Sequence, residues 1–174
     1  LALMRPYWLW VQGGRIFVAD TEGASVVILD LDKKAVGRVG AGAQERLTSP
    51  ISVAVDISSR IFATDSAVNL VKAYLPDGKL LWQAGALGAA GGELKKPTGI
   101  SIGMNGEVLV ADTGNSRIVA LSAETGVFVR EFGKNGAGQG ELSVPANLWV
   151  EPDGTVLVSD SILCKVQAFS REGK

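Results

Sequence analysis

The chain repeats one segment four times, and this repetition constrains its fold more than any other feature. Each copy contains a leucine and a proline three residues apart, a short apolar run, a turn, and a second apolar run that ends in aspartate. The leucine–proline pairs are Leu3/Pro6, Leu47/Pro50, Leu94/Pro97 and Leu142/Pro145. Successive prolines are 44, 47 and 48 residues apart. A period of this length is typical of a repeat architecture.

The apolar runs have the length and composition of β-strands. In the third copy we expect strands at 99–102, 107–112, 117–121 and 127–132, all rich in β-branched or aromatic residues. Asn105-Gly106 is typical of a tight hairpin turn, because both residues tolerate positive φ. The spacing is not helical, and the connections are too short for crossover helices.

The sequence therefore predicts an all-β propeller built from four-stranded antiparallel blades. The last copy shows only three strand-like runs, so its blade should lack the outer strand. The chain should form a single domain whose blades cover about 1–44, 45–91, 92–139 and 140–174.

The third copy also resembles the NHL repeat. The resemblance is carried by the segments 110–118 and 126–133, and by the glycine-rich run that leads through Glu141-Leu142 to Pro145. The other copies depart from the motif at the position of Arg117, where they carry Ser25, Leu70 and Lys165. The resemblance implies a propeller. Proteins of this family include protein-binding platforms, RNA binders, modules that recognise sugars or peptides and, less often, lyases or lactonases.

NHL propellers usually close with about six blades, within a general range of about four to eight. We therefore expect roughly two further blades, either beyond this segment or from another chain in a homo-oligomer that completes the ring. Trp10 and Trp149 occupy equivalent positions of the first strand, where the middle copies carry Ala54 and Ser101. The two rings either pack ordinarily between blades or cover bare faces at the ends of a half-ring.

The aspartates that close the second strands are structural candidates rather than a ring of metal ligands: Asp20, Asp65, Asp112 and Asp160. A carboxylate just before a turn is expected to accept backbone N–H bonds from that turn. Arg117 should pair with Asp112 across the hairpin. The glycine-rich stretches 40–42, 85–92 and 133–140 lack the spacing of phosphate-binding loops and are expected to connect the blades.

One end of the propeller is the expected ligand-binding surface. The loops that enter the first strands and the loops between second and third strands should meet there, and rigid scaffolds often carry binding residues on such loops. The candidate residues are Arg46, Glu93, Lys95, Asn115, Gln139 and Glu141, beside Gln44 and Glu45. Their mixed polar character suits a protein partner or a glycan or peptide ligand, although each residue also fits an ordinary solvated turn.

Catalytic chemistry finds little support. The chain has no histidine and no G-x-S-x-G motif, and its one cysteine, Cys164, points away from the adjacent Lys165 if both lie in a strand. We therefore expect no catalytic residue, no cofactor and no metal. The net charge of −1 disfavours nucleic acid as a partner. No apolar stretch approaches the roughly 20 residues of a membrane helix, so membrane insertion is not expected.

The leading functional hypothesis is a non-enzymatic scaffold that binds or assembles proteins through its loop face. The alternative is a propeller lyase or lactonase with a metal held by carboxylates in the central channel, for which Asn147 and Glu151 are the first residues to examine. RNA binding is a third hypothesis, which the acidic balance disfavours. The compartment stays open, with the periplasm or the extracellular space preferred.

Overall fold

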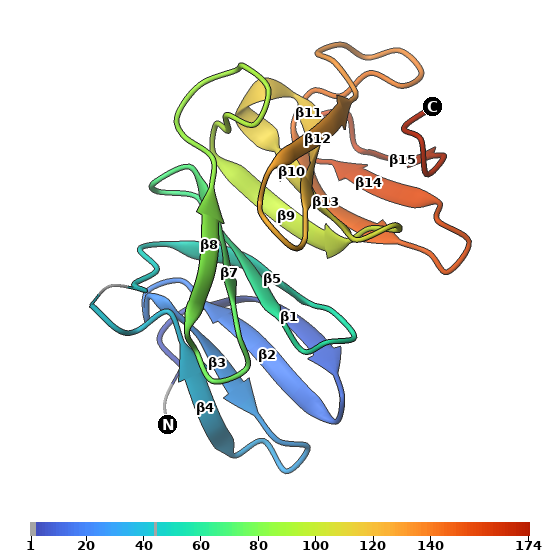
Figure 1. The fold of residues 1–174 in the computed structure, drawn as a ribbon. Coiled ribbons are helices and arrows are strands. Elements are labelled where there is room, and N and C mark those ends of the chain that lie inside the picture. The colour runs from blue at the N-terminus through green and yellow to red at the C-terminus, as the bar shows by residue number, and fades with distance from the viewer. Residues whose placement is uncertain (1–2, 44) are drawn as a thin grey trace.

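The computed structural model describes residues 3–43 and 45–174, and it is an all-β structure (Figure 1). Its strands form small antiparallel sheets that are arranged as the blades of a four-blade β-propeller. We number the blades 1 to 4 in chain order. Each sheet follows the chain from strand to neighbouring strand without a crossover. The predicted fold class is therefore confirmed.

The bounds of the strands are as follows. Blade 1 contains β1 (Pro6–Gln12), β2 (Arg15–Asp20), β3 (Ser25–Leu29) and β4 (Ala35–Val39). Blade 2 contains β5 (Pro50–Val55), β6 (Ile61–Asp65), β7 (Leu70–Tyr74) and β8 (Leu80–Ala84). Blade 3 contains β9 (Pro97–Ile102), β10 (Glu107–Asp112), β11 (Arg117–Ser122) and β12 (Phe128–Phe132). Blade 4 contains β13 (Pro145–Val150), β14 (Val156–Asp160) and β15 (Lys165–Phe169).

The strands agree with those expected from the sequence to within a few residues at their ends. A 3₁₀ turn at Thr113–Asn115 is the helical element of the described residues, and none of these residues forms a helix that could cross a membrane. The described residues build four blades, one sheet from each copy of the repeat, whereas about six blades are expected for an NHL propeller.

The middle strands of blades 2 and 3 are buried along almost their whole length because each of these blades has a neighbour on both faces. Every residue of β6 is buried, and so are almost all residues of β10 and β11. In the β10–β11 hairpin, Val110 pairs with Val119 on one face and Leu109 with Ala120 on the other. Successive side chains of these strands point to opposite faces of the sheet. Both faces are therefore apolar, whereas a sheet with one solvated face would have an apolar and a polar face.

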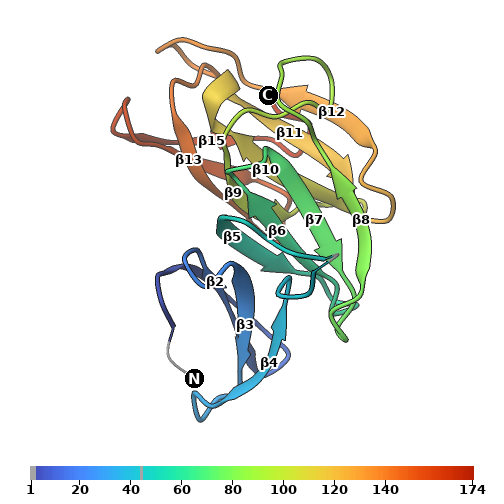
Figure 2. The same cartoon turned by 90° about the vertical axis from the view of Figure 1, so that its left-hand side faces the viewer.

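The hydrophobic core is divided into three clusters, and each cluster lies between consecutive blades. Phe17 of blade 1 packs with Tyr74 of blade 2, Phe62 of blade 2 packs with Ile100 of blade 3, and Phe132 of blade 3 packs with Phe169 of blade 4. Among the described residues, no such cluster joins blade 4 to blade 1. Figure 2 shows blades 1, 2 and 3 one above another in this order.

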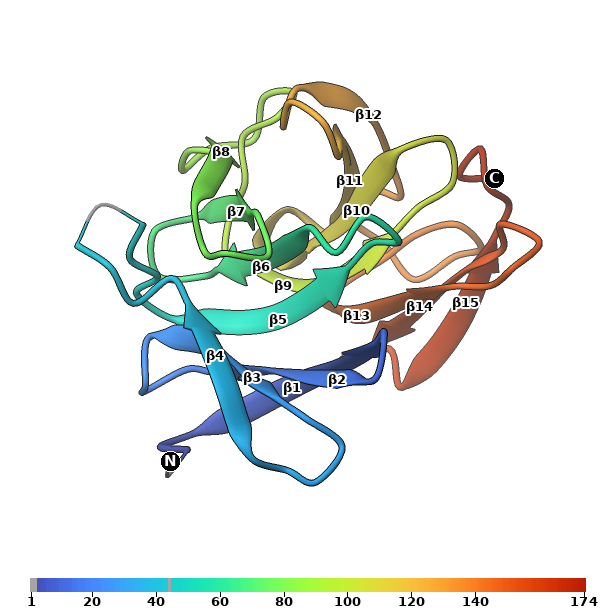
Figure 3. The same cartoon turned by 60° about the horizontal axis from the view of Figure 1, so that its bottom comes forward.

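The first strands of the blades are the innermost, and consecutive first strands contact one another. Figure 3 shows β1, β5, β9 and β13 together on the inner side, with β4, β8, β12 and β15 farther out. The loops at the two ends of these strands are the surfaces on which a ligand site can form.

Candidate functional site

The repeated leucine, proline and aspartate form one clamp in each blade. Leu47, Leu94 and Leu142 are fully buried. In blades 1, 2 and 4, the two residues between leucine and proline donate backbone N–H bonds to the aspartate at the end of the second strand, whereas in blade 3 Lys95 alone donates to Asp112. These donors are Met4 and Arg5 for Asp20, Thr48 and Ser49 for Asp65, and Ser143 and Val144 for Asp160. The carboxylates thus hold the loop that enters each blade.

This arrangement corrects the expected source of the donors. Within the described residues, Asp160 is the one aspartate of the four that also accepts backbone N–H bonds from the turn after its strand. The donors are Ile162 and Leu163. The entry loop reaches the aspartates because β1, β5, β9 and β13 start beside the ends of the second strands. Burial by itself raises the pKa of Asp160, but its four backbone donors outweigh this effect and hold the pKa below its usual value.

Blade 3 adds a buried arginine to the clamp. Arg117 Nε donates to Asp112 Oδ2 at 2.8 Å, so the predicted pair is present. Its other guanidinium nitrogens donate to the carbonyls of Ala89, Ala90 and Glu93 and to the carboxylate of Glu131. The guanidinium therefore ties the third strand of the blade to the connector that precedes the blade.

Other blades fix their connectors from the same strand with different side chains. In blade 2, Lys72 Nζ donates to the Arg46 carbonyl, and Tyr74 Oη donates to the Glu45 carbonyl at 2.6 Å. Burial raises the pKa of Tyr74 and keeps this phenol a donor. In blade 4, Lys165 donates to the Ala137 carbonyl at 3.0 Å, and Gln167 donates to the Glu141 carbonyl at 2.6 Å.

Three of the predicted binding residues are engaged in these loops. Glu93 accepts the Ala90 N–H at 2.9 Å, and Glu141 accepts the Gly138 N–H at 2.9 Å. The bond from Gly138 is the main reason why the pKa of Glu141 lies below its usual value. Asn115 donates to the Gly88 carbonyl and to Asp112. The side chains of these three residues shape the loops, which limits their freedom to meet a ligand.

The other three candidates are exposed: Arg46, Lys95 and Gln139. Gln44, expected on the same end, lies outside the described residues. Lys95 borders a groove of about 490 Å³ between blades 2 and 3, lined by Ser49, Ile51, Ser66, Ala67, Asn69, Leu87, Lys95 and Lys96. Arg46 and Gln139 do not line it, so the structure does not gather the exposed candidates into one site.

The groove combines two cations with apolar surface. Leu87 is 70% exposed, and no ion pair of the described residues involves either Lys95 or Lys96. Asn69 Oδ1 accepts the backbone N–H of Lys96 at 2.8 Å and so joins the wall of blade 2 to the entry loop of blade 3. Sequence reasoning missed Ile51 and Leu87, because different blades bring these residues together.

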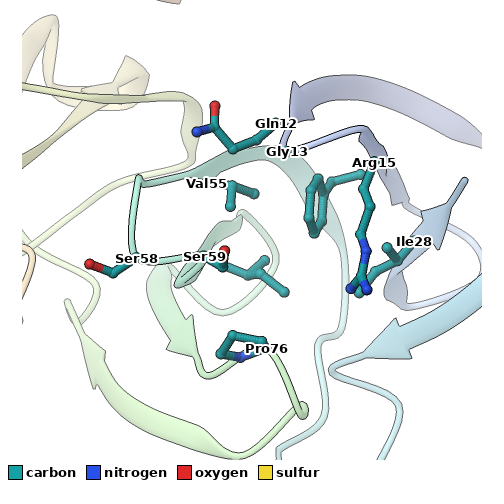
Figure 4. Close-up of a pocket in the computed structure, with 10 residues that line it drawn as sticks. Gln12, Gly13, Arg15, Ile28, Val55, Ser58, Ser59 and Pro76 are labelled. Atoms are coloured by element: carbon teal, nitrogen blue, oxygen red, sulfur yellow. The ribbon is translucent and has the colours of Figure 1, made fainter. Parts of the chain in front are cut away.

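A second pocket, of about 430 Å³, lies at the opposite end of blades 1 and 2 (Figure 4). Its apolar lining consists of Phe17, Ile28, Val55, Ile61 and Pro76, and its polar lining of Gln12, Arg15, Ser58 and Ser59 beside Gly13. Arg15 extends along the pocket next to Ile28 in Figure 4. Such a lining suits a small molecule with an apolar body and an anionic group. No sequence motif marks it.

The residues considered for a metal do not come together. The described residues contain no group of three or more His, Cys, Asp or Glu side chains placed to hold a metal ion. Asn147 Oδ1 accepts the N–H of Leu148 at 2.9 Å, and Glu151 lies in the turn after β13. Cys164 is exposed and free.

Trp10 in β1 and Trp149 in β13 contact each other between the innermost strands of the two end blades. Their ring centroids are 5.5 Å apart, and the rings are tilted by 38°. Trp10 also packs against the clusters between blades 1 and 2 and between blades 2 and 3. Trp149 remains 51% exposed. The two long indole side chains therefore reach between the end blades, whose strands share no buried cluster within the described residues.

These features define the class of the protein as a β-propeller with interlocked blade-entry loops. Its third blade carries an NHL repeat, because the NHL repeat family matches residues 94–121. The resemblance noted in the sequence is thus confirmed.

Comparison with known proteins supports the same fold. The chain is 28% identical over 136 residues to Protein SUPPRESSOR OF QUENCHING 1, chloroplastic, of Arabidopsis thaliana, which covers 63% of this chain and 13% of that protein. A streptogramin B lyase structure superposes with a TM-score of 0.75 at 18% identity, covering 97% of this chain and 52% of the lyase. The gluconolactonase XC5397 of Xanthomonas campestris superposes with a TM-score of 0.69 at 22% identity, covering 92% of this chain and 56% of the gluconolactonase chain. The chain thus spans about half of the lyase chain and about half of the gluconolactonase chain.

Proposed function

We propose that the chain is a non-enzymatic binding module that takes an acidic, partly apolar protein segment on its loop face. The proposal is supported by one observation above all. The groove between blades 2 and 3 places Lys95 and Lys96 beside Ile51 and Leu87. Carboxylates of a partner would pair with the ammonium groups, and its apolar side chains would cover Leu87.

The groove is supported by a connector that is held in place. Arg117 binds three carbonyls of the connector, and the carboxylate of Glu93 binds the backbone of Ala90 inside it. A loop that is already ordered loses less conformational entropy when a partner binds. The hydrogen bonds of Arg117 thus favour binding without any contact between Arg117 and the partner.

A peptide titration tests this function. The probe is a short fluorescein-labelled peptide that alternates glutamate and leucine, and its glutamine counterpart is the neutral control. We expect the double variant Lys95→Glu/Lys96→Glu to weaken binding of the acidic peptide by at least about tenfold, or about 1.4 kcal/mol. Added salt should weaken wild-type binding in the same direction. Fluorescence anisotropy measures both effects.

The chain offers a matched control in Lys33 and Lys34, an exposed lysine pair in the turn between β3 and β4 of blade 1. The double variant Lys33→Glu/Lys34→Glu changes the net charge equally but lies away from the groove. Equal loss of binding in the two double variants, or equal binding of the glutamine peptide, would contradict the proposal.

A lyase or lactonase is the second candidate, and its support is the likeness of fold to the streptogramin B lyase and the gluconolactonase. The proposed metal does not fit the residues considered for it, since the Asn147 amide oxygen is used by the backbone and Glu151 lies beyond the strand. Metal content of the purified protein, measured by mass spectrometry, tests this candidate. A stoichiometric divalent cation would favour it over the binding module.

A further inference from the structure

Each blade has a forward face toward the next blade and a rear face toward the preceding one. At every internal interface, the same two positions of the repeat share a buried cluster. One position is the second residue of the third strand of a blade. The other lies three residues after the proline that begins the first strand of the next blade. These pairs are Val26 with Val53, Val71 with Ile100, and Ile118 with Leu148. All six side chains are between 0% and 4% exposed. The same pair of positions thus builds each interface.

The fourth pair of this series is exposed. Val166 is the second residue of β15, and Leu9 lies three residues after Pro6 in β1. Val166 is 66% exposed and Leu9 is 57% exposed. Blade 4 therefore does not bury its forward face against the rear face of blade 1. Both surfaces nevertheless carry the residue types that the internal interfaces bury.

The two end faces are apolar beyond this pair. On the rear face of blade 1, Tyr7 is 60% exposed and Val11 is 57% exposed. A groove of about 400 Å³ is lined by Trp149, Leu157 and Val166 on the forward face of blade 4 and is bordered by Trp8 of blade 1. Exposed apolar surfaces of this kind mark sites of association.

A longer propeller chain contains about one more chain's length beyond the part that this chain matches. The chain superposes along 97% of its length on 52% of the lyase chain. The rest of the lyase chain is about as long as a second copy of this chain. A second copy would present a forward face to blade 1 and a rear face to blade 4, which are the two surfaces that the end blades lack.

We propose that two copies of this chain associate head to tail and bury the end faces in two identical seams. Leu9 of each copy then packs against Val166 of the other, as Val53 packs with Val26 inside the chain. A two-fold axis along the propeller axis relates the copies, so the contact closes and does not grow into a filament. The resulting ring stays within the range of about four to eight blades.

The native mass of the purified chain, measured by sedimentation equilibrium, tests the proposal. We expect twice the chain mass of 18.1 kDa. Leu9→Lys and Val166→Glu should each give the single-chain mass, because either change buries a charge in both seams. Each position is more than half exposed in one chain, so circular dichroism should show unchanged folding. Val129→Lys is the control, since Val129 is 48% exposed on the outer strand β12.

Mixing the two variants separates this contact from any other. In an equimolar mixture, one seam places the new lysine opposite the new glutamate, and the other seam is unchanged. The mixture should therefore recover the double mass although neither variant does so alone. The proposal is overturned if wild type keeps the single-chain mass from about 1 to about 100 µM. It is equally overturned if Leu9→Lys or Val166→Glu alone keeps twice the chain mass, or if their mixture keeps the single-chain mass.

Discussion

At the scale of single residues, Arg117 shows why one copy of the repeat matches the NHL motif better than the others. Its planar guanidinium binds the Asp112 carboxylate and three connector carbonyls at once. Lysine at the equivalent position of blade 4, Lys165, reaches two carbonyls, those of Ala137 and Gly138. The motif arginine therefore adds an ion pair to a connector clamp that blade 4 makes without it.

Replacing Arg117 tests how much this clamp contributes. Arg117→Ala leaves Asp112, which is 0% exposed, with a buried charge and no cation beside it. We expect the free energy of unfolding to fall by about 3–5 kcal/mol. Lys165→Ala, the same position in blade 4, should cost less than about 1 kcal/mol because its contacts are exposed. Urea denaturation measures both values, and similar losses would show that the Arg117–Asp112 pair has no special role.

At the scale of elements, the connectors depend on backbone shape as well as on hydrogen bonds. Gly85 begins the connector between blades 2 and 3 with a φ of +105°. A Cβ atom there would lie 2.6 Å from the Asn69 carbonyl oxygen and 2.9 Å from Leu94 Cδ1. The connector thus passes so close to blade 2 that no side chain fits between them.

Comparing alanine substitutions at two glycines separates the cost of this close approach from the cost of left-handed backbone strain in a turn. Gly106, in the β9–β10 turn, has a φ of +74° and open space around its missing Cβ. Gly106→Ala should cost about 1–2 kcal/mol from left-handed strain alone. Gly85→Ala should lose a further 1–3 kcal/mol or so, since Asn69 is backbone and Leu94 is buried. Thermal unfolding compares the two, and equal costs would mean that the connector moves away freely.

At the scale of the whole molecule, stability is shared between neighbouring blades. Each buried cluster joins two consecutive blades, so the middle blades are packed on both faces and the end blades on one. The strand β6 is buried at every position, whereas β15 alternates between intermediate and exposed residues before Phe169. Local opening should therefore begin at the end blades.

Hydrogen exchange measured by mass spectrometry tests this distribution. The Leu9→Lys variant is the sample, so that association of two copies does not protect the end faces. Amides of β6, β7, β10 and β11 should exchange at least about tenfold more slowly than amides of β14 and β15. Uniform protection would indicate that the chain opens only as a single cooperative unit.

Much of the fold follows from local patterns that the sequence carries openly. The repeat, the strand bounds and the Arg117–Asp112 pair were all predictable, because strand length, turn chemistry and pairing across a hairpin depend on residues close in sequence. The sequence pattern predicts the wrong donor loop for Asp20 and Asp65, and only the turn donors of Asp160, which also accepts N–H bonds from its entry loop. Fifteen to seventeen residues separate these carboxylates from their entry-loop donors, and only the finished hairpin brings them together.

The sequence by itself determined that this protein is built from radial β-sheets and that aspartate and proline recur at each blade entry. Only the tertiary structure decided which equivalent apolar positions are buried. Val53 and Leu9 hold the same place in the repeat, yet one is 0% and the other 57% exposed. The reason is physical: a residue is buried by its neighbour across the interface, and the repeat pattern does not say whether a blade has that neighbour. The groove with Lys95, Lys96 and Leu87 has the same origin, since two blades must meet to form it.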